Sequence, residues 1–150
     1  MNIFGAIVAG LIGTIVITIV MAMAPKMGMP KMDMVGMLGS MFSSESNRTL
    51  GMGIHLMMGV VFAIVYALLW NLGLGSIGLL WGAIFGAGHW LVAGAMMGGM
   101  PMMHAGIKAG TVQAPGVFML HNGGMMAFMG GLMGHIIFGL VVALVYGLFV

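Results

Sequence analysis

The sequence has very little charge. Only four basic and two acidic residues occur among 150, so charged residues make up 4% of the chain, against roughly 25% in soluble domains. Six charged side chains cannot cover a surface that faces water. We therefore expect a lipid bilayer to surround most of the chain. The net charge of +2 comes from too few residues to form a nucleic-acid surface.

Cysteine is absent, which excludes disulfides, thiolate metal sites and thiol catalysis. Paired carboxylates are absent too, because the only acids, Asp33 and Glu45, lie in one loop. That argues against a carboxylate proton relay and against a hard-cation cage. The sequence also lacks a Ser-His-acid arrangement, a phosphate loop and a dinucleotide fingerprint. We therefore expect no enzyme activity unless a metal supplies the chemistry.

Long apolar runs are abundant, and 62% of the residues are hydrophobic. Only helices or closed barrels can span a bilayer, and continuous runs without alternation favour helices. The sequence predicts four spans, at residues 4–24, 50–70, 77–98 and within 124–150, the last starting near Phe128. Pro25 is expected to close the first span, which we interpret as a retained helix rather than a cleaved signal peptide. The predicted fold is an all-α membrane protein forming one transmembrane helical-bundle domain over residues 1–150.

A two-helix hairpin occurs twice, as repeat 1 (residues 1–72) and repeat 2 (residues 77–150). Second and fourth spans match at an offset of 80 residues, and first and third spans at an offset of 76. The matched pairs include Gly10/Gly86, Pro25/Pro101, Gly51/Gly131, His55/His135, Gly59/Gly139, Ala63/Ala143 and Tyr66/Tyr146. A repeated hairpin keeps its orientation, so we predict tandem parallel repeats with a pseudo-two-fold axis along the membrane normal.

Small residues four apart place a stripe on one face of the second and fourth spans, where helix backbones can approach closely. His55 and His135 interrupt these stripes at equivalent positions and should face protein. If the stripes meet, the two imidazoles would be close together. The stripes could instead pack on the first and third spans, or on another protomer.

The loops between spans set the expected orientation. Basic residues occur only in the two long loops, at Lys26, Lys31, Arg48 and Lys108. The positive-inside rule then places both long loops in the cytoplasm and both termini outside. Within the first loop, residues 32–42 have apolar residues at helical spacing but cannot span a bilayer. They predict a short interfacial or re-entrant helix.

The Gly/Thr-rich first span is followed by Ala24-Pro25-Lys-Met-Gly-Met-Pro-Lys-Met-Asp33. Over its whole length the chain resembles the small four-helix proteins of bacterial inner membranes. This resemblance of type implies an inner-membrane location, and no functional residue follows from it.

Five histidines are candidate site residues, because ionisable side chains inside a membrane usually have partners and functions. His55, His89 and His135 are expected within spans, and His104 and His121 in the second long loop. Each could donate a hydrogen bond to a neighbouring helix, or several could bind a metal. His55 and His135, at matched depth, could also bind a b-type haem as a cofactor.

Methionine is the second type of candidate site residue, and the chain contains 22 of them. Several form close pairs: Met21/Met23, Met27/Met29, Met32/Met34, Met96/Met97, Met102/Met103 and Met125/Met126. Thioethers suit Cu(I), and close pairs let a short segment supply two sulfurs. Methionine is equally a flexible packing residue beside glycine-rich helices. The candidate metal ligands are Met27, Met29, Met102, Met103, His104 and His121 near the loops, with His89 inside the membrane.

Three functions remain open from these residues. The first is a membrane protein that binds or handles Cu(I) through Met and His. The second is a non-catalytic structural or accessory subunit, held in a homo-oligomer or with other membrane subunits by its glycine stripes. The third is a bis-histidine b-type haem carrier.

Overall fold

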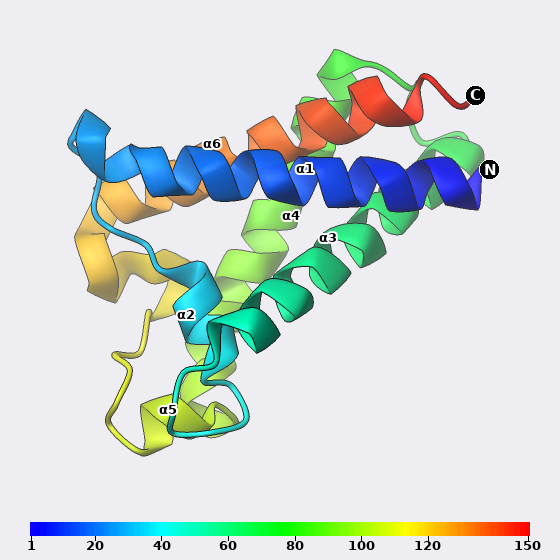
Figure 1. The fold of residues 1–150 in the computed structure, drawn as a ribbon. Coiled ribbons are helices and arrows are strands. Elements are labelled where there is room, and N and C mark those ends of the chain that lie inside the picture. Colours follow the sequence, from blue (N-terminus) through cyan, green and yellow to red (C-terminus); the bar gives the residue numbers. More distant parts are fainter. The chain divides into compact units, whose positions relative to one another are not determined.

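The computed structural model describes all 150 residues and contains helices but no strands (Figure 1). The α-helices are α1 (Ile3–Met23), α2 (Met34–Gly39), α3 (Arg48–Asn71), α4 (Leu79–Met96), α5 (Ala105–Lys108) and α6 (Leu120–Tyr146). Three short 3-10 helices join them: η1 (Ala24–Met27), η2 (Met97–Met102) and η3 (Val117–Met119).

Four helical stretches are long and apolar enough to cross a membrane. They are Ile3–Met27, Arg48–Asn71, Leu79–Met102 and Val117–Tyr146. The prediction of an all-helical chain with four potential spans is therefore confirmed. These segments form helices because a long continuous apolar run can satisfy its own backbone hydrogen bonds only as a helix.

The fourth helix begins earlier than the sequence predicts. We expected its start near Phe128, but α6 begins at Leu120. Its first turn is joined to the remainder across a kink, where Gly123 and Gly124 leave the helical conformation. Gly124 has a positive φ of 56°, which glycine adopts without steric cost. The two glycines that indicated a loop therefore mark a break inside a longer helical segment.

The first helix ends one residue earlier than expected. Helix α1 stops at Met23, and Pro25 occupies an early position of η1 rather than following a helix that ends at Ala24. Proline disfavours the α conformation in the residue before it, which explains this boundary. Gly28 then closes η1 with a left-handed φ of 80°.

The chain forms two compact units. Unit 1 comprises Met1–Val20, Leu56–Trp90 and Leu132–Val150, and unit 2 comprises Met21–His55 and Leu91–Gly131. Each unit takes residues from both halves of the sequence. All six charged residues belong to unit 2, and unit 1 contains none.

Glycine contacts join helices in pairs within unit 1. A Cβ atom on Gly10 of α1 would lie 2.6 Å from the Cα of Val60 in α3. A Cβ on Gly139 of α6 would overlap the carbonyl oxygen of Gly82 in α4. The small-residue stripes of α3 and α6 therefore pack on α1 and α4, which is one of the arrangements that the sequence left open.

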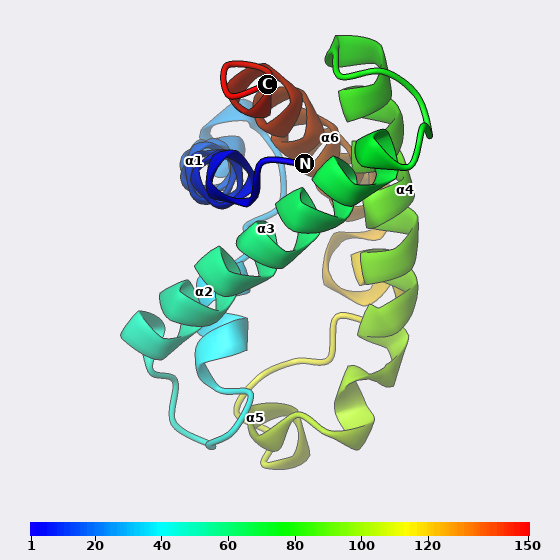
Figure 2. The same cartoon turned by 90° about the vertical axis from the view of Figure 1, so that its right-hand side faces the viewer.

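Helices α1 and α6 also lie side by side in unit 1 (Figure 1), where a Cβ on Gly13 would meet the ring of Phe138. The two chain ends lie close together (Figure 2) and are joined by hydrogen bonds. The Asn2 backbone N–H donates to the Tyr146 hydroxyl (3.1 Å), and the Asn2 side-chain amide donates to the Phe149 carbonyl (3.1 Å). The N-terminal amine donates to Asn71 Oδ1 (3.0 Å).

Short helices and loops make up much of unit 2. Residues 32–42 were expected to be helical, and α2 forms over Met34–Gly39 with Asp33 as its N-cap. Asp33 Oδ1 accepts a hydrogen bond from the Gly36 N–H (2.9 Å), which satisfies a free donor of the first turn. The segment after α2 is bonded to α5, because Ala105 N–H donates to Met41 O and Gly106 N–H donates to Ser40 O (3.0 Å each).

Candidate functional site

Unit 2 contains a cavity of about 400 Å³. Four methionines contribute to its wall: Met32, Met34, Met37 and Met119. The other lining residues are Lys31, Asp33, Gly36, Ser46, Thr111, Val112, Gln113 and Asn122. Soft thioethers and a few oxygen donors therefore surround one space that is large enough for a metal ion or a small ligand.

Local geometry explains how three of the methionines reach the cavity. Met34 and Met37 are three residues apart in α2, so they share one face of that helix. Met32 immediately precedes the Asp33 cap. Met37 is buried, with 7% of its surface exposed, while Met32 and Met34 are half-buried. The cap that starts α2 therefore also directs its methionines into the wall of the cavity.

Met119 reaches the same cavity from η3, through an unusual backbone. Phe118 and Met119 have positive φ angles of 54° and 60°, a region that side-chain-bearing residues enter at a cost of about 1–3 kcal/mol. Met119 is nonetheless only 4% exposed. Burial of its thioether in the cavity wall compensates for backbone strain, and strain of this kind is often found at binding sites.

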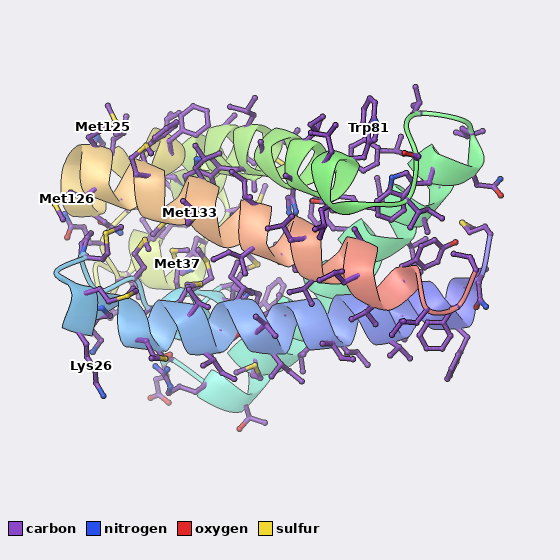
Figure 3. All side chains as sticks on the ribbon, turned by 90° about the horizontal axis from the view of Figure 1, so that it is seen from above. Lys26, Met37, Trp81, Met125, Met126 and Met133 are labelled. Atoms are coloured by element: carbon purple, nitrogen blue, oxygen red, sulfur yellow. The ribbon has the colours of Figure 1, made fainter.

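A further thioether lies beside Met32. A Cβ atom on Gly130 of α6 would lie 2.9 Å from the Met29 methyl and 3.0 Å from the Met32 methyl. Both methionine side chains therefore end over the same glycine. Sulfur atoms are also frequent around Met125 and Met126, near the start of α6 (Figure 3). Met29, one of the predicted metal ligands, is thus adjacent to a methionine of the cavity.

The polar part of the cavity wall has one anion and one unsatisfied acceptor. Asp33 Oδ2 is 2.6 Å from Nη1 of Arg48, and this hydrogen bond lowers the pKa of the Asp33 carboxyl below its ordinary value. The Oδ1 atom of Asn122 is buried and has no hydrogen-bond partner. A buried acceptor without a donor is costly, and a cation in the cavity would satisfy it.

Unit 1 contains a pair of histidines, one from α4 and one from α6. The ring centroids of His89 and His135 are 4.6 Å apart, and the rings are nearly perpendicular at 89°. His89 Nδ1 is 3.3 Å from the Tyr66 hydroxyl of α3. The sequence placed His55 and His135 close together only if the two small-residue stripes meet, and the pair found in unit 1 is His89–His135. His55 belongs to unit 2, so its pairing with His135 stays a prediction.

Aromatic rings fix the orientation of this histidine pair. His89 stacks on Phe62, with centroids 3.5 Å apart and an interplanar angle of 21°. The ring of His135 lies 5.1 Å from that of Trp90, at 40°. Tyr66 in turn packs edge-on against Phe138, with centroids 6.0 Å apart. Both imidazoles therefore have restricted freedom of rotation.

His104 has a different role in unit 2. It is completely buried, and its Nδ1 accepts a hydrogen bond from the Ile107 N–H (3.1 Å) as the N-cap of α5. That leaves the proton on Nε2, which lies 2.8 Å from the Met37 carbonyl and donates to it. Both ring nitrogens are thus used by the backbone, and a metal could bind His104 only by displacing one of these bonds.

The remaining predicted ligands lie on exposed surface. Met27, Met102 and Met103 are 66%, 80% and 73% exposed. His121 is exposed, and its ring lies over Gly116. No group of three or more His, Asp or Glu side chains comes together in the structure.

Sequence reasoning did not select any of the four cavity methionines as site residues. Met32 and Met34 were recognisable as a close pair, and Met37 followed at helical spacing. Met119 had no such signal, because an unusual backbone conformation brings it to the cavity. No family model matches the chain, and comparison with curated proteins and with solved structures also gave no match.

Proposed function

We propose that this chain is a multi-pass membrane protein that binds Cu(I), a soft monovalent ion, in the methionine-lined cavity of unit 2. The observation that supports this most directly is the convergence of Met32, Met34, Met37 and Met119 on one cavity of about 400 Å³. Neutral thioethers prefer Cu(I) over hard cations. The chain contains no cysteine that could serve as a stronger soft ligand.

The charges around the cavity disfavour a divalent cation more strongly than a monovalent one. Asp33 contributes one negative charge, which Arg48 already shares through a half-exposed ion pair, and Lys31 adds a positive charge. A doubly charged ion would require more anionic ligands than the cavity wall provides. Unlike a carboxylate, a thioether needs no counter-charge, so several methionines can bind Cu(I) without creating a buried net anion.

A membrane location is supported by the four helical stretches that are long enough to cross a bilayer. All four basic residues belong to unit 2, whereas both chain ends belong to unit 1. Figure 3 shows the labelled Lys26 side chain pointing away from the helices. These features favour an inner-membrane orientation with the long loops in the cytoplasm and both termini outside. In that orientation α2 is an interfacial or re-entrant helix near the cytoplasmic surface.

The tandem repeat is supported by equivalent contacts within unit 1. Gly10 and Gly59 pack together between α1 and α3, and Gly86 and Gly139 pack together between α4 and α6. These pairs are related by the two offsets found in the sequence, 76 and 80 residues. Helices α1 and α4 are also both followed by a 3-10 helix that contains proline. We propose that each hairpin closes through its own glycine pair.

Haem binding has less support than copper binding. Two histidines that ligate one haem iron from opposite faces have ring centroids roughly 6 Å apart, and those of His89 and His135 are 4.6 Å apart. A porphyrin does not fit between these two rings, and haem ligation by His55 and His135, the pair that the sequence suggested, stays a prediction. Association into homo-oligomers or with other membrane subunits stays a prediction, and a defined oligomer that binds no copper would favour that role.

The proposal is tested with detergent-purified full-length protein and a chromophoric Cu(I) chelator as competitor. We expect Met37→Leu combined with Met119→Leu to weaken Cu(I) binding at the cavity by at least about tenfold, because leucine conserves volume but removes sulfur. The matched control is Met57→Leu with Met58→Leu, two exposed methionines of α3. Equal Cu(I) affinity in both double variants would contradict the proposal, provided that circular dichroism shows native helix content.

A further inference from the structure

We infer that Met29 and Met32 form an entry site, at which Cu(I) binds before it passes into the methionine-lined cavity of unit 2. The inference rests on the proposed function, because it concerns the route to that cavity. Met32 lines the cavity, and the side chains of Met29 and Met32 both end over Gly130 of α6. Met32 therefore connects Met29 to the cavity wall.

Gly130 leaves the space in which the two thioethers meet. The position that a Cβ atom would take on Gly130 is 2.9 Å from the Met29 methyl carbon, 3.0 Å from the Met32 methyl carbon and 3.9 Å from Met32 Sδ. Each sulfur is bonded directly to its methyl carbon, and methionine side chains have flexible torsions. Small rotations would therefore bring both sulfurs onto one soft ion, for which thioethers are suitable ligands.

The chain segment that carries both methionines is anchored on each side. The Met29 backbone N–H donates to the Ala24 carbonyl (3.1 Å), and Asp33 caps α2. Between these points Pro30 packs against α6, where a Cβ on Gly123 would lie 2.7 Å from Pro30 Cγ. The backbone is thus held in place while the two thioethers can rotate, which is the combination that ligand exchange requires.

The exposure of the methionines decreases from the entry site to the cavity wall. Met29 and Met32 are half-buried. Met37 and Met119, in the cavity wall, are only 7% and 4% exposed. Met27, two residues before Met29, is 66% exposed. An ion that arrives from the surface therefore reaches Met29 and Met32 before it reaches the buried pair.

Transfer between thioethers requires neither a proton nor an electron. A Cu–S bond to the incoming methionine forms while the bond to the outgoing ligand breaks, and copper stays in the +1 state throughout. A thioether has no proton to release, so no base is needed when it binds the ion. Met32 can therefore pass Cu(I) to the other cavity methionines by ligand exchange alone.

The test measures the rate of Cu(I) transfer and the affinity separately. Full-length protein in detergent is mixed anaerobically with Cu(I) bound to a chromophoric chelator, and stopped-flow absorbance gives the transfer rate while titration gives the affinity. We expect Met29→Leu to slow transfer by about tenfold. The affinity should stay within about twofold of wild type, because Met29 does not line the cavity. Release to excess chelator should then slow by the same factor as uptake. The matched control is Met57→Leu, which removes an exposed thioether of α3 and should change neither rate.

Gly130→Ala tests the same site without removing a sulfur. Its new methyl group would displace the ends of two flexible side chains rather than backbone atoms, so the fold should survive while the thioethers are separated. We expect slower Cu(I) transfer than in wild type. Gly53→Ala adds the same group to α3 in open space and should leave the rate unchanged.

The outcomes separate this inference from the proposed function. An unchanged transfer rate in Met29→Leu, with Cu(I) still bound in the cavity, would overturn the entry site and leave the proposed function intact. An affinity loss of about tenfold or more in Met29→Leu would also overturn the entry site, since Met29 would then be a ligand of the final site. Wild-type protein that binds no Cu(I) would overturn both. If Met29→Leu fails to fold, the transfer rate of Gly130→Ala against that of Gly53→Ala decides.

Discussion

The two units differ in charge and in how their helices pack. Unit 1 has no charged side chains, and its helices α1/α3 and α4/α6 approach through glycines whose backbones touch. Tyr66 and His89 contact each other there, and the buried Thr14 hydroxyl donates to the Gly10 carbonyl of its own helix. Unit 2 is built around short helices, and its buried polar side chains bond mainly to backbone, as Ser40 and His104 do.

His89 and His104 illustrate the difference between the units. Both imidazoles occur in apolar surroundings, but His104 has both nitrogens in backbone hydrogen bonds, whereas His89 has a phenol and a second imidazole as neighbours. The residue type alone therefore does not identify a ligand. What matters is whether the fold leaves a nitrogen for an external partner.

The largest effect is expected where backbones touch in unit 1. A Cβ in Gly139→Ala would overlap the Gly82 carbonyl oxygen, a backbone atom that cannot rotate away. We expect destabilisation by about 3 kcal/mol or more, measured by unfolding in mixed micelles. Gly88→Ala, in open space on α4, should instead stabilise by up to about 1 kcal/mol. Similar effects of both variants would refute close glycine packing.

A slightly smaller effect is expected from the structural histidine of unit 2. His104→Ala removes the N-cap of α5 and the bond to the Met37 carbonyl, and it leaves a cavity at a fully buried position. Two lost hydrogen bonds and the cavity together should cost about 2–3 kcal/mol. His121→Ala, at an exposed position, serves as the control and should change the free energy of unfolding by less than about 0.5 kcal/mol. An unchanged free energy of unfolding in His104→Ala would contradict the structural role that distinguishes His104 from His89.

The first turn of α1 offers an intermediate test in unit 1. Asn2 Oδ1 accepts from the Gly5 N–H (2.9 Å), and its side-chain amide donates to the Phe149 carbonyl (3.1 Å). We expect Asn2→Ala to lower stability by about 1 kcal/mol. Asn2→Asp keeps the acceptor for Gly5 and should recover part of that loss. Hydrogen exchange at Gly5 would detect fraying, and unchanged protection in Asn2→Ala would argue against the cap.

The smallest effect is expected at Asp33, the charged N-cap of α2 in unit 2. The hydrogen bond from Arg48, followed by the backbone bond from Gly36, lowers the pKa of Asp33 in the folded state below its value in the unfolded chain. Its stabilisation is therefore complete above the unfolded pKa of 3.8 and is lost as pH falls through the lower folded pKa. We expect a shallow acid-side loss of stability that Asp33→Asn abolishes. The ion pair is substantially exposed, so added salt should weaken the effect.

Much of the fold could be predicted from the sequence, because apolar run length decides which segments can span a bilayer. The four long helices, the proline-limited end of the first helix and the short helix of the first loop were all anticipated. The kink at Gly123–Gly124 was not, since two adjacent glycines are equally compatible with a loop. The observed helix boundaries differ from the predicted ones where local turn chemistry, rather than hydrophobicity, determines the chain direction.

The candidate sites were harder to predict than the helices. Periodicity identified His135 as facing protein, but which imidazole it meets depends on helix packing, and α4 supplies His89. The cavity combines Met34 and Met37, which share a helix face, with Met119, which a left-handed backbone brings to the wall. Long-range pairing and positive φ angles leave no periodic signal in a single sequence.

The uneven exposure of the methionines has a chemical consequence. Oxidants convert accessible thioethers to sulfoxides first, and Met27, Met102, Met103 and Met125 are all more than half exposed, whereas Met37 and Met119 are 7% and 4% exposed. The outer methionines would therefore scavenge peroxide before it reached those of the cavity wall. Reduction of their sulfoxides by repair enzymes would restore them, so the surface could be renewed while the buried sulfurs stayed intact.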